Sequence, residues 1–242
     1  MSSTGKYIPG SQERPGFYGF TRFVLSIVLP FLFKFDVQGI ENIPENGAVL
    51  LASNHFSGWD ILATAFSMKR MLHFMAKSEY TKSRFLTWLF TKLEAFFVNR
   101  GEGDTEAIRN CLAVLKANQA LIIYPEGHRS EDHKLIKAHE GFALIALKSG
   151  APVVPVSVWG SELVLRKGYH WPHQPVVHIR FGQPLVFAAS GKKYTRADMQ
   201  SATDDTMRAI AAALPEDYRG VYAQLPEPAA AGNSPTENEE TR

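Results

Sequence analysis

This sequence has one cysteine, no long apolar run and a small net charge, and each of these features argues against a class of protein. Cys111 is the single cysteine among 242 residues, so the chain cannot form an internal disulfide and its composition fits a reducing compartment. The apolar run Phe23–Phe33 has 11 residues without a charge, whereas a helix needs ~20 to cross a bilayer. No cleavage site of small residues follows this run, so we do not expect a secretory signal peptide.

Charge is almost balanced over the whole chain but not between its parts. With 26 basic and 24 acidic residues the net charge is +2, while residues 226–242 carry four Glu and one Arg, which leaves +5 on the remainder. A weakly basic body suits anionic partners such as phosphate esters and lipid headgroups, but it does not indicate nucleic-acid binding. The acidic tail over 226–242 is expected to be disordered, because Pro, Ala, Glu and Asn dominate it.

Residues 1–35 combine a polar, mobile start with the apolar and aromatic segment "FYGFTRFVLSIVLPFLFKF" at 17–35. Arg22 interrupts this segment, and Pro30 is expected to break it. Two interpretations stay open. With Arg22 and Lys34 beside a Phe-rich centre, the segment fits a helical element that lies in a membrane interface. Alternatively, it is a buried helix that caps the domain.

Across residues 36–225, short apolar segments alternate with longer segments of helical periodicity. Besides a short strand near Asp36, six segments are typical of buried strands: 48–52, 73–77, 95–99, 120–124, 152–160 and 175–182. Five are typical of helices: 59–69, 84–93, 104–118, 141–150 with Gly150 as its C-cap, and 195–214. This alternation predicts one α/β domain with a largely parallel, mixed sheet flanked by helices.

The stretch "ASNHFSGWDIL" at 52–62 places His55 and Asp60 five positions apart, directly after a predicted buried strand. In a continuous helix these positions point ~140° apart, and their side chains cannot meet. Ser57 and Gly58 favour a turn, however, which leaves His55 in a loop and Asp60 in the first turn of the helix. We therefore expect the Asp60 carboxylate to accept a hydrogen bond from one imidazole nitrogen, so that the other nitrogen can remove a proton.

Taken alone, this pattern is equally typical of a structural hydrogen bond at a helix start. A nucleophile elbow, G-x-S-x-G, occurs nowhere in the chain, so the hydroxyl to be deprotonated would belong to a substrate. His128, His133 and His139 lie within 12 residues and "HWPH" follows at 170–173, but these spacings fit no standard metal-ligand pattern. We expect no bound metal.

Charged residues follow the ends of two other predicted strands. Arg100 follows "FFVN", and "YPEGHRS" places Glu126, Gly127 and Arg129 after the strand 120–124. The carboxyl ends of parallel strands meet at one crevice, where ligands bind in this class of fold. A base beside two arginines is typical of a site for a hydroxyl-bearing phosphate ester, because a guanidinium group binds phosphate through two parallel hydrogen bonds.

Four blocks in this order, "NHFSGWD", "FFVNRG", "YPEGHRS" and "APVVPVSV", resemble those of the glycerolipid acyltransferases, most closely the 1-acylglycerol-3-phosphate O-acyltransferase type. The resemblance covers roughly residues 36–190. It implies transfer of a fatty acyl group from acyl-CoA or acyl-carrier protein to the free hydroxyl of a lysophosphatidate-like acceptor in phospholipid biosynthesis. It also implies no permanently bound cofactor, and a position at the cytoplasmic face of a membrane.

The resemblance also implies roles for individual residues. His55 would be the general base, Asp60 its orienting partner, and Lys77 a group that stabilises the oxyanion. Acceptor and phosphate binding would fall to four further residues: Arg100, Glu126, Gly127 and Arg129. For Lys77 the alternative is a merely solvated side chain, and for Glu126 it is a carboxylate that only braces its loop.

Three positions depart from the family pattern. His128 stands where the third block usually has threonine, Glu94 where glycine is common, and Asn99 where a charged residue is common. Because the second and third blocks hold the acceptor, an ornithine lipid or a lysophospholipid with a larger headgroup stays open as the acceptor. Outside acyl transfer, two alternatives stay open, namely a non-catalytic lipid- or phosphate-binding module and a hydrolase in which His55 and Asp60 activate water.

The region 69–92 carries six basic residues against one acid, interleaved with Phe, Leu and Trp. It favours a cationic, aromatic surface that contacts a membrane, because an acceptor with an acyl tail must enter from lipid. In the alternative, the apolar residues pack inward and the charges are simply solvated.

Overall fold

The computed structural model of the chain describes residues 15–98, 105–168, 172–187 and 194–224. Most of the polar start and the acidic tail that the sequence predicts lie outside these residues. Within them, seven strands form one sheet in the order β1-β7-β6-β2-β5-β3-β4. The strands are β1 (Lys34–Gln38), β2 (Val49–Ser53), β3 (Leu72–Lys77), β4 (Ala95–Val98), β5 (Ala120–Ile123), β6 (Val153–Trp159) and β7 (Val176–Phe181).

Five neighbouring strands, from β6 through β2, β5 and β3 to β4, run parallel to one another. Strand β7 is antiparallel to β6, and β1 pairs with β7 in parallel. This arrangement confirms the largely parallel, mixed sheet that the sequence predicts. It also brings the carboxyl ends of the five parallel strands to one edge of the sheet.

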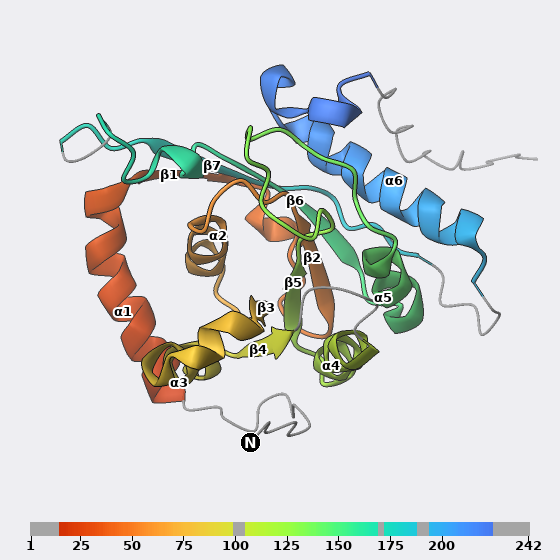
Figure 1. Ribbon diagram of the computed structural model, residues 1–242, viewed down its shortest axis with the longest axis horizontal. Helices are drawn as coiled ribbons and strands as arrows, with labels where there is room; N and C mark the ends of the chain where they lie inside the picture. Colours follow the sequence, from red (N-terminus) through yellow and green to blue (C-terminus); the bar gives the residue numbers. More distant parts are fainter. Residues whose placement is uncertain (1–14, 99–104, 169–171, 188–193, 225–242) are drawn as a thin grey trace, which may run out of the picture.

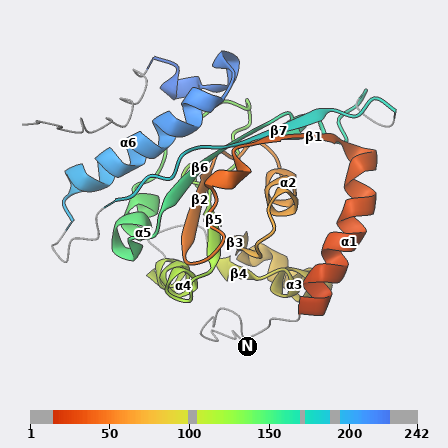
Figure 2. The ribbon, with the colours of Figure 1, turned by 180° about the vertical axis from the view of Figure 1, so that it is seen from behind.

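Six helices cover the two faces of the sheet (Figures 1 and 2). They are α1 (Pro15–Leu32), α2 (Asp60–Ser67), α3 (Arg84–Lys92), α4 (Thr105–Lys116), α5 (Gly141–Ser149) and α6 (Arg196–Ala213). Helices α1, α2 and α3 lie on one face and α4, α5 and α6 on the other, as both views show. Each face therefore has its own apolar core, one built on Leu29, Leu51 and Ile122 and the other on Leu50, Phe142 and Met207.

The central strands are buried on both sides, which explains their continuous apolar sequences. All five residues of β2 and all four of β5 are buried, whereas β7 alternates buried Val177, Ile179 and Phe181 with more exposed residues. Double burial favours runs of branched apolar residues, and alternation marks a strand with one open face. Helix α5 ends as the sequence predicts, at Gly150 in the left-handed conformation, with φ of 62°.

The position before β4, where the resemblance led us to expect glycine, also has left-handed backbone geometry. Glu94 occupies it with φ of 61° and is buried, with its Oε2 3.7 Å from Nε2 of His73. A side chain with a Cβ is disfavoured in this conformation, so the departure from glycine carries a local cost. The buried contact to His73 offers a physical reason for its retention.

Helix α1 continues through Pro30, where the sequence indicated a break. Only Phe31 and Leu32 follow Pro30 within the helix, so its missing N–H costs one internal hydrogen bond near the helix end. The Arg22 side chain points toward α2 and not toward solvent. Its guanidinium donates to the carbonyl oxygens of Ala65 at 3.0 Å and Met68 at 2.6 Å, at the carboxyl end of α2, where cations are favoured.

Helix α1 has one buried apolar face and one exposed apolar face. Leu29 is 1% exposed and packs into the core, as a capping helix requires. The opposite face is exposed and carries no charge: Phe20, Phe23, Val24, Ile27, Val28 and Phe31. Among the helices in the described residues, none combines the length and the apolarity needed to traverse a bilayer.

Candidate active site

The candidate site forms where the parallel strands end. His55 follows β2, Tyr124 follows β5, Lys77 is the last residue of β3, and Ser161 follows β6 by two residues. Because these four strands are neighbours, their ends lie side by side. Arg100, which the sequence places after β4, lies outside the described residues.

The Asp60 carboxylate is the buried centre of this cluster. Its side chain has no exposure to solvent. Oδ2 accepts hydrogen bonds from the His55 Nδ1 at 2.9 Å and from the backbone N–H groups of Phe56 and Ser57, both at 2.8 Å. Oδ1 accepts a further hydrogen bond from the Ser161 hydroxyl. A buried carboxylate is tolerated only when its oxygens are satisfied in this way.

The local sequence explains why Asp60 receives these bonds. Asp60 is the first residue of α2, and the turn through Ser57 and Gly58 folds the preceding backbone over its carboxylate. Phe56 and Ser57 precede the helix, so their N–H groups have no helical partner and can donate to the carboxylate. The predicted turn between His55 and Asp60 is therefore present, and the two side chains meet.

His55 is held at the boundary between this polar cluster and open space. Its side chain is 13% exposed, and its ring stacks on the Tyr124 ring at a centroid distance of 4.0 Å and an angle of 20°. With Nδ1 bonded to Asp60, Nε2 is the nitrogen left for a substrate proton. Carboxylate, imidazole and aromatic ring together fix the orientation of a potential base.

Ser161 and Asn54 were not among the residues singled out from the sequence. Asn54 is fully buried, and its side-chain amide makes two hydrogen bonds to the backbone of Val158, at 2.7 and 2.8 Å. This clamp joins the loop after β2 to β6 and brings Ser161 against Asp60. A sequence signal existed for Ser161, since it directly follows a predicted strand end, but its pairing with a residue 101 positions away is visible only in the fold.

Glu126 is buried and connects two loops. Its side chain has no exposure, and its two oxygens accept from the backbone N–H groups of His55 and Ile136, both at 2.9 Å. These two hydrogen bonds are what the bracing alternative requires, and acceptor binding by Glu126 stays a prediction. Burial raises the pKa of the Glu126 carboxyl to about 7, although the two N–H donors oppose this shift.

Gly127 and Arg129 shape the turn that follows Glu126. Gly127 has φ of 75°, and a Cβ there would lie 2.9 Å from Cδ2 of His139, so a side chain at this position is disfavoured. The exposed Arg129 guanidinium reaches back to the His55 loop, where its Nη1 stands 3.8 Å from the Cβ that Gly58 lacks. A guanidinium beside the imidazole is well placed to bind an anionic group of a ligand.

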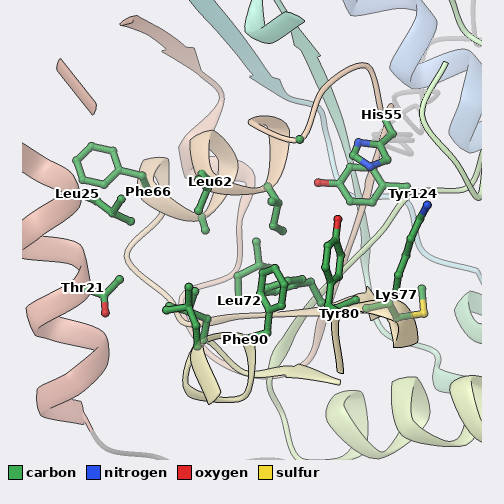
Figure 3. Close-up of a pocket in the computed structure, with 18 of the residues that line it drawn as sticks. Thr21, Leu25, His55, Leu62, Phe66, Leu72, Lys77, Tyr80, Phe90 and Tyr124 are labelled. Atoms are coloured by element: carbon green, nitrogen blue, oxygen red, sulfur yellow. The ribbon is translucent and has the colours of Figure 1, made fainter. Parts of the chain in front are cut away.

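A cavity of about 380 Å³ extends from His55 into the layer of α1, α2 and α3. Figure 3 shows His55, Tyr124 and Lys77 at one end and Thr21, Leu25 and Phe66 at the other. Between the two ends, the cavity is lined by the apolar side chains of Leu62, Leu72 and Phe90. The cavity therefore joins a polar end that holds the candidate base to a long apolar interior, and its size is typical of a ligand pocket.

The sequence model of the Acyltransferase family matches residues 34–159, which are just over half of this chain. The match contains His55, Asp60, Lys77, Glu126 and Arg129. The chain belongs to this family.

Individual members of known function also resemble this chain. The chain is 28% identical over 144 residues to the chloroplastic 1-acyl-sn-glycerol-3-phosphate acyltransferase BAT2 of Brassica napus, covering 58% of this chain and 41% of the relative. The chain thus matches about two fifths of that relative's length. It is also 30% identical over 152 residues to a lyso-ornithine lipid O-acyltransferase of Pseudomonas aeruginosa, covering 62% of this chain and 57% of that protein.

A solved structure shares the fold. The crystal structure of the 1-acyl-sn-glycerophosphate (LPA) acyltransferase PlsC from Thermotoga maritima aligns with a TM-score of 0.60 and 27% sequence identity. The alignment covers 81% of this chain and 86% of that chain. The α/β fold of the chain is therefore that of an acyltransferase.

The raised pKa of Glu126 predicts a pH dependence of stability. In the unfolded chain this carboxyl titrates near 4.5, so between about pH 4.5 and 7 the folded state binds more protons than the unfolded state. The free energy of unfolding should therefore fall as pH rises through this window, by roughly 3 kcal/mol in all. Glu126→Gln removes the titration and should flatten this part of the profile, as measured by urea unfolding at pH 4.5 to 8.

Glu131→Gln is the matched control, because Glu131 is exposed on the same loop. It should leave the pH profile of unfolding unchanged. An unaltered slope in Glu126→Gln would contradict the assignment of the titration to Glu126.

Proposed function

We propose that this chain transfers a fatty acyl group from acyl-CoA or acyl-carrier protein to the free hydroxyl of a lysophosphatidate-like acceptor, in phospholipid biosynthesis. The observation that carries the proposal is the position of His55, oriented by Asp60 at the polar end of an otherwise apolar cavity. A non-catalytic binding module would need no oriented imidazole at this position. Family membership supports acyl transfer independently.

The proposed reaction is direct attack without a covalent enzyme intermediate. His55 Nε2 removes the proton of the acceptor hydroxyl while the oxygen forms a bond to the thioester carbonyl carbon. The carbonyl π electrons move to oxygen, and the resulting oxyanion is stabilised by the Lys77 ammonium. Collapse re-forms the carbonyl and breaks the carbon–sulfur bond. The leaving thiolate takes the proton from the His55 imidazolium, which restores the neutral base.

The acceptor is proposed to bind through its phosphate at Arg129, beside the His55 loop. Arg100 is assigned the same role on the sequence alone. Gly127 permits the turn that brings Arg129 there, and Glu126 holds this turn and the His55 backbone together. A lyso-ornithine lipid is the second candidate acceptor, since a relative bears that name and His128 departs from the common pattern of this block.

The chain is further proposed to work on a membrane surface, at its cytoplasmic face, as a peripheral or monotopic protein. The uncharged outer face of α1 and the exposed Phe85 and Trp88 of α3 lie on the same side of the sheet as the cavity. Lys82 and Arg84 add exposed positive charge beside Phe85, which suits anionic headgroups. Arg70 does not contribute, because its guanidinium donates to the carbonyl oxygen of Pro44 at 2.7 Å.

The test of the base is acceptor-dependent thiol release. Wild type should release thiol from palmitoyl-CoA only when lysophosphatidate is present, and His55→Ala should lower kcat by about 10²–10⁴-fold. Asp60→Asn should also lower kcat, since the amide cannot serve all four donors. His173→Ala, an exposed histidine away from the cavity, should match wild type. Thiol release without acceptor would identify a hydrolase, and no release at all would identify a binding module.

Arg129→Ala tests how the acceptor is held. Loss of the guanidinium should raise KM for lysophosphatidate by about tenfold or more, with a smaller change in kcat, because a phosphate contact binds substrate and transition state alike. Arg129→Lys should restore only part of the affinity. The comparison with lyso-ornithine lipid, which has no phosphate, identifies the acceptor class. An unchanged KM for lysophosphatidate would remove Arg129 from the phosphate site.

Vesicle sedimentation tests the membrane surface. Phe23→Ser and Trp88→Ser each remove an exposed apolar side chain, and each should weaken binding to vesicles of phosphatidylethanolamine and phosphatidylglycerol by about tenfold or more. Val221→Ser is the control, because Val221 is 64% exposed, like Phe23 at 63%, but lies in the segment after α6. Equal binding of all three variants would contradict the proposed surface.

A further inference from the structure

The Tyr124 hydroxyl is a buried polar group without a hydrogen-bond partner among the described residues. A hydroxyl in this state costs free energy unless something else binds it. Tyr124 lines the cavity, and Figure 3 shows its hydroxyl pointing from beneath the His55 ring into the interior. The cavity is the space beside this residue in which a bound ligand would supply the missing partner.

The position of Tyr124 is fixed by its surroundings rather than adjustable. It is the first residue after β5, between the strand ends that carry His55 and Lys77. Its ring lies 4.0 Å from the imidazole in a stacked arrangement. A backbone turn follows directly, closed by the Gly127 N–H bonded to the Tyr124 carbonyl at 2.9 Å. A donor held this rigidly needs no rearrangement during a reaction.

The hydroxyl is kept in its protonated, donating form. Burial raises the pKa of Tyr124 well above its usual value near 10, and the negative charge of Asp60 adds to this effect. A neutral phenol can therefore donate a hydrogen bond to a developing negative oxygen, but it will not act as the base. That leaves base chemistry to His55 alone.

We propose that the Tyr124 hydroxyl donates a hydrogen bond to the carbonyl oxygen of the acyl thioester and to the oxyanion that forms from it. Tyr124 is then a catalytic residue. This inference rests on the proposed acyl transfer and adds a neutral donor opposite the charged Lys77. In Figure 3 the Lys77 amine lies at the same end of the cavity as His55 and Tyr124. The phenol keeps its hydrogen throughout the reaction, so this role adds no proton transfer to the mechanism.

Tyr124→Phe is the sharpest test, because it removes one oxygen and keeps the stacked ring. Loss of an oxyanion donor should lower kcat by about 10²-fold, with KM for palmitoyl-CoA within about twofold of wild type. The unliganded variant should have a Tm equal to or above that of wild type, since an unsatisfied buried hydroxyl has been removed. Tyr194→Phe is the matched control, because the Tyr194 hydroxyl donates to Leu147 O at 2.8 Å, away from the cavity.

A second measurement does not depend on turnover. A palmitoyl-CoA analogue with a methylene in place of the thioester sulfur and a ¹³C-labelled carbonyl would be bound to wild type and to Tyr124→Phe. The ¹³C=O stretching frequency should be lower in wild type, because a hydrogen bond weakens the carbonyl bond. If wild type shows this shift but no acyl transfer, the proposed function fails and the contact stands.

Two results would overturn the inference. One is an identical carbonyl frequency in the two proteins. The other is a Tyr124→Phe variant in an active enzyme whose kcat stays within about threefold of wild type. A thioether analogue, which has no carbonyl, should bind both proteins equally. Weaker binding of that analogue to Tyr124→Phe would assign the hydroxyl to chain binding instead and contradict the proposal.

Discussion

Burial of the Asp60 carboxylate is the constraint on which the site depends. Removing such a charge from water costs several kcal/mol, so the fold must supply donors to both of its oxygens. It does so from separate parts of the chain: the backbone after β2, the His55 ring and the Ser161 hydroxyl after β6. Each donor is thereby held in place by the charge it satisfies. The orientation of the imidazole is one consequence of this arrangement.

The same edge of the sheet also borders an apolar cavity. One side of His55 faces the buried polar cluster, and the other opens on a cavity walled by the three helices of one face. Helix α1 contributes to this wall and at the same time exposes its uncharged outer face. Arg22 ties it to the end of α2. The site therefore combines a buried polar cluster, an apolar cavity and the exposed Arg129.

Much of this fold follows from local patterns in the sequence. Continuous apolar runs predicted the buried strands, and the turn residues between His55 and Asp60 predicted that the two side chains meet. The contacts of Ser161 and Asn54 could not be predicted, because they join residues more than 100 positions apart and depend on which strands are neighbours. Motif reasoning placed Glu126 at the acceptor, whereas burial turns its carboxylate to two backbone N–H groups. The break expected at Pro30 is absent because packing outweighs one lost hydrogen bond so near a helix end.

The central claim is that Asp60 holds the His55 ring with a proton on Nδ1 and leaves Nε2 bare to act as the base. Nitrogen-15 NMR of the histidine side chains, with His55 assigned by comparison with His55→Ala, reads this arrangement directly. At a pH where the ring is neutral, the account predicts the Nδ1–H tautomer, with an Nε2 shift typical of an unprotonated nitrogen and with loss of this preference in Asp60→Asn. A ring with its proton on Nε2, or a tautomer that does not respond to Asp60→Asn, would contradict it.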